Sequence, residues 1–184
     1  MEKRTNKTIT LGSGHLYAMV FAGTIPEDNV IETETNRLSY IKGGAVIEYS
    51  GEFYDASDDL NMVSKRKLTT EEVLIKSGLM TWNMKTLEKL CSTARIIENN
   101  GIRTAKIGGV KNDDGKYYVI HFVHKDEVDG DVRVTIVGQN SAGFALTFAS
   151  DQETVIDSEF KASPGKLDEE GTLIIIKEDI GPSA

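Results

Sequence analysis

The residue types that most often carry chemistry occur in this sequence without the spacing that chemistry requires. Gly12-Ser13-Gly14 resembles the start of a phosphate-binding loop, but Tyr17 stands where a dinucleotide-binding fingerprint needs its third glycine. Neither Gly-Lys-Ser nor Gly-Lys-Thr occurs anywhere in the chain. The sequence therefore argues against nucleotide binding.

The histidines, the single cysteine and the aspartates of residues 126–131 are also explained without a site. His121 and His124 lie three positions apart on a predicted strand, so they point to opposite faces and cannot hold one ion together. Cys91 falls on the apolar stripe of a predicted helix, where packing is its expected role. The aspartates lack the alternating spacing and terminal glutamate of a calcium loop, and no Gly-x-Ser-x-Gly elbow is present. We expect no catalytic residue, cofactor or metal, and hence no enzyme.

Composition limits the class of protein further. The chain has 184 residues, 39% of them hydrophobic, and a formal net charge of −8, which is typical of one acidic globular domain. The charge opposes binding along a nucleic-acid backbone. No apolar run approaches the roughly 20 residues that span a bilayer, and the polar start is unlike an export signal. We therefore expect neither membrane insertion nor secretion.

Alternating polarity predicts a mainly β fold with antiparallel strands. In residues 45–54, one predicted face carries Ala45, Ile47, Tyr49 and Phe53, and the other carries Glu48, Ser50 and Glu52. Turn signals at residues 112–115 and 125–130 predict hairpins. Similar patterns predict strands at residues 16–21, 73–79, 103–110, 117–124, 132–136, 143–149, 154–160 and 172–177.

One helix interrupts the predicted strands. Leu87, Leu90, Cys91 and Ala94 follow helical spacing, and a cap at Thr81 or Asn83 predicts a helix over residues 83–97. Asn99-Asn100-Gly101 is interpreted as its stop. The apolar stripe indicates that this helix flanks a sheet.

A charged stretch at residues 55–67 breaks the strand pattern and is predicted to form a long loop. Two interpretations stay open: a solvated connection, or an adhesive loop whose opposite charges meet those of a neighbouring copy. The segments 1–8 and 168–184 are predicted to be flexible arms. The charged residues of the loop are Asp55, Asp58, Asp59, Lys65, Arg66 and Lys67.

The order of several segments also resembles a known family, the major tail, or tail tube, proteins of tailed phages of Gram-positive hosts. No single motif is as specific as a metal signature, but the resemblance covers most of the chain in order. The segments that carry it are residues 8–17, 24–26, 40–45, 78–83, 103–109, 131–140 and 153–160.

The resemblance implies a β-sandwich of two packed antiparallel sheets with one flanking helix, assembled as hexameric rings that stack into a hollow tail. Type VI secretion tube proteins share this architecture. It also implies an inner wall of roughly 24 strands, whose spacing of about 4.8 Å and tilt of about 40° give a diameter near 48 Å. Side chains would narrow this to roughly 35–40 Å, which is wide enough for a DNA duplex.

In such a tube, residues 55–67 would form the contact between rings, and Glu48 and Glu52 would lie in the lumen or on the outer surface. An acidic lumen would let DNA pass without specific binding. The implied partners are further copies of the chain, tape measure, tail terminator and baseplate proteins, and a sheath in a contractile tail. The implied location is the virion tail, assembled in the host cytoplasm.

Other functions stay open at this point. The chain is also compatible with the tube of a contractile tail, bacteriocin or secretion system, or with a baseplate ring. A more distant alternative is a β-barrel that binds a small molecule, which would require an apolar pocket with a few polar groups.

Overall fold

The computed structural model describes residues 3–5, 7–60 and 62–180. Strands make up most of the regular structure in this part of the chain. The elements are, in order, β1 (His15–Val20), α1 (Asp28–Ile31), β2 (Arg37–Ser39), β3 (Ile41–Ser57), β4 (Ser64–Leu79), α2 (Met84–Leu90), β5 (Arg95–Asn99), β6 (Ile102–Lys106), the 3-10 helix η1 (Val110–Asn112), β7 (Tyr118–His124), β8 (Val132–Asn140), β9 (Ile156–Ala162) and β10 (Ile175–Glu178).

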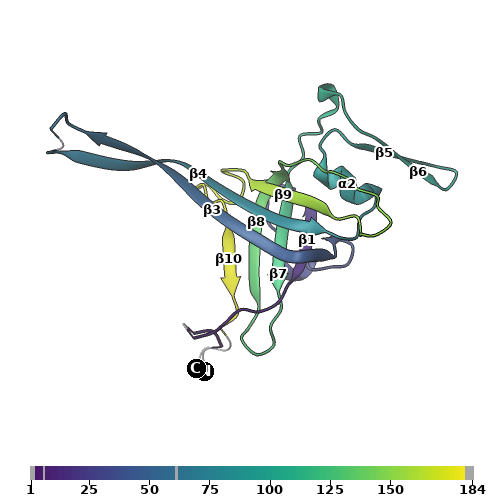
Figure 1. Cartoon of the computed structure of the whole chain (residues 1–184), viewed down its shortest axis with the longest axis horizontal. Helices are drawn as coiled ribbons and strands as arrows, with labels where there is room; N and C mark the ends of the chain where they lie inside the picture. Colours follow the sequence, from purple (N-terminus) through teal and green to yellow (C-terminus); the bar gives the residue numbers. More distant parts are fainter. Residues whose placement is uncertain (1–2, 6, 61, 181–184) are drawn as a thin grey trace.

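The strands form two antiparallel sheets, so the predicted fold class is confirmed. The large sheet has the order β2-β1-β7-β8-β9-β4-β3, with β10 paired to β8, and the small sheet consists of β5 and β6. β3, β4 and β9 cross over β1, β7 and β8 (Figure 1). The two layers of the sandwich are therefore parts of one continuous, folded sheet, and α2 flanks them.

The sheet folds over at the end of β8. This strand pairs with β7 from Val132 to Gly138 but with β9 only from Gly138 to Asn140. At Gly138 an added Cβ would lie 1.9 Å from the backbone oxygen of Lys161 on β9. A side chain there would collide with the neighbouring strand, so glycine is required for the close approach that turns one layer over the other.

The main core lies between the two layers. On β4 the side chains from Val73 to Leu79 alternate between buried and half-buried, and β9 alternates in the same way. This is the pattern of strands with one face on the core. The buried members of this core include Leu16, Val73, Ile75, Leu79, Leu87, Leu90, Ile120, Ile136, Ile156 and Phe160.

β7 is buried on both faces, and its second face carries a smaller core with an ionic group beside it. Glu32, just after α1, accepts a hydrogen bond of 2.6 Å from Nε of Arg133 on β8. His121 is fully buried, with Nδ1 2.8 Å from the Thr135 hydroxyl and Nε2 3.5 Å from the Glu32 carboxylate. Burial lowers the pKa of His121 because the charged imidazolium is poorly solvated there. These contacts hold the end of α1 against β7 and β8.

The predicted helix over residues 83–97 was too long. Asn83 caps α2 by accepting hydrogen bonds from the backbone of Lys85 and Thr86, as its type predicts. The helix ends at Leu90, whose carbonyl accepts a hydrogen bond from the Asn140 side chain, and Cys91 already has an extended backbone. Ile96 and Ile97 belong to β5, where β-branched side chains are favoured.

Asn99-Asn100-Gly101 is therefore a hairpin turn and not a helix stop. Asn99 pairs with Ile102, and Asn100 and Gly101 both have positive φ angles of 48° and 75°. These are the conformations that Asn-Gly supplies in a two-residue hairpin. The signal was present in the sequence and was assigned to the wrong element.

Other strand predictions were partly right. Strands near residues 16–21, 73–79, 117–124, 132–136, 154–160 and 172–177 are present, and residues 125–130 connect paired strands β7 and β8. Residues 143–149 form no strand, and residues 103–110 are a strand only as far as Lys106. Residues 112–115 do not form a hairpin, because β6 pairs with β5 and the chain then crosses to β7 in the other sheet.

The predicted long loop and C-terminal arm also need correction. Residues 55–57 and 64–67 continue β3 and β4, so the connection between these strands is only residues 58–63. Within residues 168–184, β10 pairs with β8 from Ile175 to Glu178, so this part is a sheet strand. Residues 1–2 and 6 of the predicted N-terminal arm, and 181–184 of the C-terminal arm, lie outside the described residues. Within the described chain, no helix is both long and apolar enough to cross a membrane.

We predict that Gly138→Ala lowers the free energy of unfolding by about 3 kcal/mol or more, because the methyl group must displace the β9 backbone. Urea unfolding monitored by circular dichroism measures this. Gly143→Ala is the control: its φ angle is unfavourable, at 68°, but the space around it is open, so we expect a loss of only about 1 kcal/mol. Equal losses in the two variants would contradict the steric role of Gly138.

We also predict that stability falls on acidification below the ordinary histidine pKa of about 6.5. The pKa of His121 is lowered in the folded state, so the unfolded chain binds the extra proton first, and acid favours unfolding. Melting temperatures between pH 7.5 and 5 should show this slope, and His121→Asn should flatten it. Burial also lowers the pKa of His15, but this histidine is partly exposed, so His15→Asn should remove a smaller part of the slope than His121→Asn. An unchanged slope in His121→Asn would refute the assignment.

Candidate assembly surfaces

The β3–β4 hairpin extends well beyond the core of the molecule (Figure 1). Its inner part is packed on the core through Ala45, Ile47 and alternate residues of β4. From Tyr49 outward, nearly every residue of both strands is exposed, yet apolar side chains continue on the face that is buried further in. Tyr49 is 60% and Phe53 50% exposed. The alternation in the sequence is therefore typical of a strand face that is buried, but the single chain leaves the outer part of this face exposed.

A bulge in β4 keeps this apolar face together. The register shifts between Glu52 and Phe53, so that Glu52 pairs with Thr70 but Phe53 pairs with Leu68. The extra residue, Thr69, returns Leu68 to the side of the hairpin that carries Phe53. Gly51 leaves space for the Leu68 side chain, since an added Cβ would lie 2.9 Å from its Cδ1. We call Tyr49, Gly51, Phe53 and Leu68 the hairpin patch.

The tip of the hairpin is also apolar. Leu60, Met62 and Val63 are each more than 70% exposed. Asp58 closes the turn, since its carboxylate accepts a 2.8 Å hydrogen bond from the Val63 amide. Two strands alone are marginally stable in water, so a ribbon of this length with uncovered apolar side chains is typical of a contact surface.

The six charged residues predicted for ring stacking all lie at this outer end of the hairpin, but the two charge groups are not separate poles. Asp55 and Arg66 are directly opposite in the register and 3.6 Å apart, and both are largely exposed. Lys65 and Lys67 form no ion pair with any described residue. Their role in stacking stays a prediction. The remaining two members, Asp58 and Asp59, lie in the connection between the strands.

The outer face of β3, β4 and β9 is polar and turned away from the core. Glu48 and Glu52 both lie on it, as their alternation predicted. Lys76 Nζ is 2.7 Å from the Glu48 carboxylate and 3.4 Å from that of Glu159, and the bond to Glu48 raises the pKa of Lys76. From Val46 to Glu52 and on the paired residues of β4 and β9, four carboxylates stand against two lysines: Glu48, Glu52, Glu72 and Glu159 against Lys76 and Lys161. Over the whole face the numbers are equal, because the register also places Asp157, Lys42, Lys65 and Lys67 on it.

β3 is also an edge strand. It ends the strand order of the large sheet, and no described residue pairs with its outer side over its 17 residues. A long uncovered edge presents backbone donors and acceptors to another chain. The register shift between Lys42 and Ala45 marks a bulge at Gly43-Gly44.

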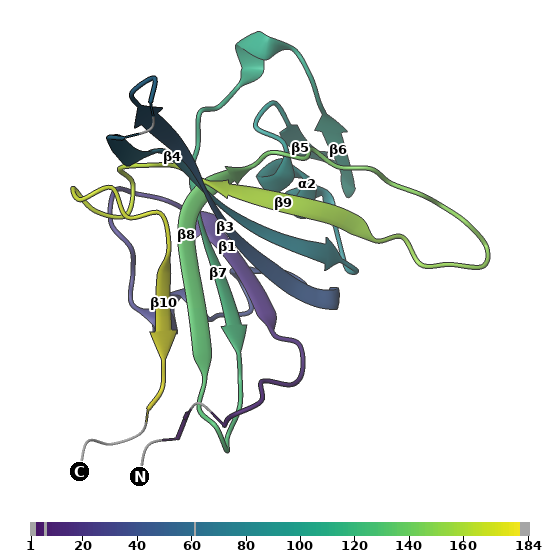
Figure 2. The same cartoon turned by 60° about the vertical axis from the view of Figure 1, so that its left-hand side comes forward.

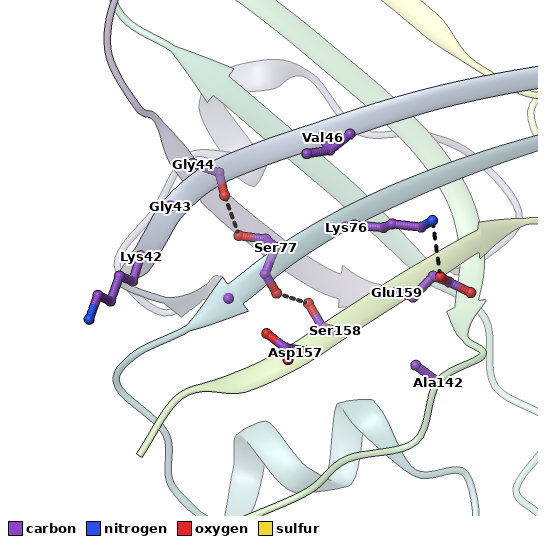
Figure 3. A pocket seen from close by; sticks show the side chains of 11 residues that line it. Lys42, Gly43, Gly44, Val46, Lys76, Ser77, Ala142, Asp157, Ser158 and Glu159 are labelled. Carbon is purple, nitrogen blue, oxygen red and sulfur yellow. Dashed lines mark hydrogen bonds and ion pairs between the residues drawn. The ribbon is translucent and has the colours of Figure 1, made fainter. Parts of the chain in front are cut away.

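A pocket of about 330 Å³ opens on the polar face beside this bulge (Figure 3). Ser77 donates a 3.0 Å hydrogen bond to the Gly44 carbonyl, and Ser158 donates one of 2.9 Å to the Ser77 carbonyl. The walls combine the charged side chains of Lys42, Lys76, Asp157 and Glu159 with glycines and with Val46 and Ala142. The alternative of a small-molecule site therefore stays open at this place.

The other residues considered for chemistry make structural contacts. His121 lies beside Glu32, whereas His124 Nδ1 is 2.7 Å from the Ser13 carbonyl. The two imidazoles therefore make contacts in different parts of the structure. Cys91 is half-buried just after α2, with its sulfur 3.3 Å from the Thr93 hydroxyl. Among the described residues, no group of three or more His, Cys, Asp or Glu side chains is arranged to hold a metal ion.

Sequence reasoning predicted a strand that overlaps β6 but missed β5, and so missed the small sheet, which projects from the sandwich as a two-stranded ribbon (Figure 1). Its Ile97 and Ile102 are 48% and 69% exposed. The Asn-Gly turn between β-branched residues was the signal that could have found it. The alternation that forms the hairpin patch was visible in the sequence, but the sequence did not show that the patch is exposed in the single chain.

Comparison with protein-family models gives no match, and comparison with curated proteins gives none either.

Proposed function

We propose that this protein is a structural subunit that assembles with copies of itself, as a tail tube protein does, into stacked hexameric rings that enclose a channel for DNA. The observation that carries the proposal is the hairpin patch, an apolar face that continues from the core onto a strand pair that the single chain leaves exposed. An identical subunit in the next ring would cover it.

The β3 edge supports lateral association. A neighbouring subunit that adds a strand to this edge would satisfy its free backbone groups and continue the sheet around a ring. Repeated use of one edge and one receiving surface is a heterologous contact, which closes into a ring or propagates as a filament.

The polar face of β3, β4 and β9 supports the assignment of the channel wall. It is opposite the core face, belongs to the layer that contains the open edge, and has more carboxylates than lysines over the part from Val46 to Glu52 and the residues paired with it. Negative charge repels the phosphate backbone, so a duplex would pass without being held. Glu48 and Glu52 would therefore line the channel.

We predict that Phe53→Ser with Leu68→Ser raises the protein concentration needed for assembly by about 100-fold or more, because two large apolar side chains lose their cover. Sedimentation and negative-stain electron microscopy at rising concentration measure this. Phe53 is exposed and Leu68 only half-buried in the single chain, and both lie outside the core, so the variant should fold normally by circular dichroism.

The matched control is Ile9→Ser with Val128→Ser, which removes two apolar side chains that are 74% and 81% exposed away from the hairpin. It should assemble like the wild type. Wild-type assembly that is equally strong in the Phe53–Leu68 variant would contradict the hairpin contact.

The channel assignment gives a second prediction. Glu52→Lys with Asp157→Lys reverses two charges of the polar face that form no ion pair with described residues. Tubes of this variant should still form but should bind linear duplex DNA, with affinity falling by orders of magnitude between about 50 and 200 mM salt. Filter binding measures it.

Closed circular DNA separates the channel from the outer surface, because a circle has no end to thread into a tube. The reversed charges should retain linear duplexes and release circular ones. Equal retention of both forms would place this face on the outside of the tube.

A further inference from the structure

The β5–β6 ribbon carries positive charge on an acidic protein. Residues 95–106 contain three basic side chains and one acidic one, a net charge of +2 in a chain of −8. The acidic residue, Glu98, is already paired with Arg103 across the two strands at 2.7 Å. The other basic side chains have no carboxylate partner among the described residues.

Two of these cations face one another. Arg95 on β5 is directly opposite Lys106 on β6, and both are exposed. Like charges in this arrangement destabilise a strand pair. The same face of the ribbon holds Ile97, two residues from Arg95, and Ile102, four residues from Lys106. We call these four residues the ribbon face; it combines two cations with two exposed isoleucines.

A groove with the complementary character lies at the base of the long hairpin. It has a volume of about 340 Å³, and its apolar walls come from Tyr49, Leu173 and Ile174. Two carboxylates, Glu71 and Glu170, also line the groove. Asp168 and Glu169 come directly before Glu170 on an exposed loop. Glu71 accepts a 2.7 Å hydrogen bond from the Tyr49 hydroxyl, which leaves its second oxygen to receive a cation.

The ribbon face and the groove cannot meet within one molecule. Figure 1 shows the ribbon on one side of the layer formed by β7 and β8, and the yellow segment that precedes β10 on the other. Figure 2 also shows the two segments well apart. Two complementary surfaces on opposite sides of one subunit join copies head to tail.

We propose that the ribbon face of one subunit docks into the hairpin-base groove of another copy, with Arg95 and Lys106 against Glu71 and Glu170, and with the isoleucines against Tyr49 and Leu173. The proposal rests on the self-assembly proposed above and names the surface that receives the base of the hairpin. The contact removes the repulsion between Arg95 and Lys106 and covers Tyr49, which the single chain leaves exposed.

Complementary charge reversal tests the contact. Arg95→Glu with Lys106→Glu gives a subunit whose ribbon and groove are both acidic, and Glu71→Lys with Glu170→Lys gives one in which both are basic. Each variant alone should need about 100-fold more protein to assemble than the wild type. An equal mixture should assemble near the wild-type concentration, because each ribbon then meets a groove of opposite charge. Lys7→Glu with Lys111→Glu is the control with the same charge change and should assemble normally.

A second readout does not depend on tubes. Wild-type protein with ordinary nitrogen is mixed with ¹⁵N-labelled protein at millimolar concentration and treated with a carbodiimide, which joins an amine directly to a carboxylate. Mass spectrometry should find cross-links of mixed isotope between Lys106 and Glu71 or Glu170.

The two proposals can fail separately. Wild-type tubes with unimpaired assembly of both charge variants would overturn the ribbon contact and leave the tube function standing. Mixed-isotope cross-links at Lys106 without any polymer would support the ribbon contact and count against the tube function. A wild type that gives neither polymer nor these cross-links would overturn both.

Discussion

The close approach of β8 and β9 at Gly138 is the constraint on which the rest of the structure depends. β8 shares its main length with β7 and only its last residues with β9, so one sheet turns over on itself and encloses its own core. β9 then fixes β4, and β4 fixes β3. The direction of the long hairpin, and the outward position of the polar face, follow from the geometry of this corner.

The boundary between the packed inner part and the exposed outer part of the hairpin follows from the size of that core. β9 pairs with β4 only between Leu74 and Leu79, and the layer beneath supports no more than this length. Alternation in β3 nevertheless continues to Phe53, and the bulge at Thr69 keeps Leu68 on the same side. In the outer half of the hairpin, the sequence pattern is therefore that of a buried face, whereas the single chain leaves this face exposed. Burial by a second chain would make the pattern and the packing consistent.

Sequence patterns identified the antiparallel β class, the position of most strands and the cap of α2, because each depends on local periodicity or on one side chain. They failed where contacts between residues far apart in the sequence determine the structure. Leu90 ends α2 partly because Asn140, fifty residues later, binds its carbonyl. The charges of residues 55–67 suggested a loop, but cross-strand pairing such as Asp55 with Arg66 accommodates them in strands. Glu48 and Glu52 were placed on a polar face by alternation alone; the ribbon was missed because its Asn-Gly turn was assigned to a helix end.

Assembly through exposed surfaces requires that they do not join at random. The apolar hairpin patch is nondirectional, since burial of apolar area has little geometric preference. In the proposed assembly charge supplies the selection: an acidic groove beside the patch would favour the basic ribbon and repel the carboxylates around Glu48 and Glu52. In such a division, apolar area holds subunits together, whereas charge decides which surface meets which. The +2 ribbon on a −8 chain is the arrangement that a head-to-tail contact needs and that a symmetric dimer does not.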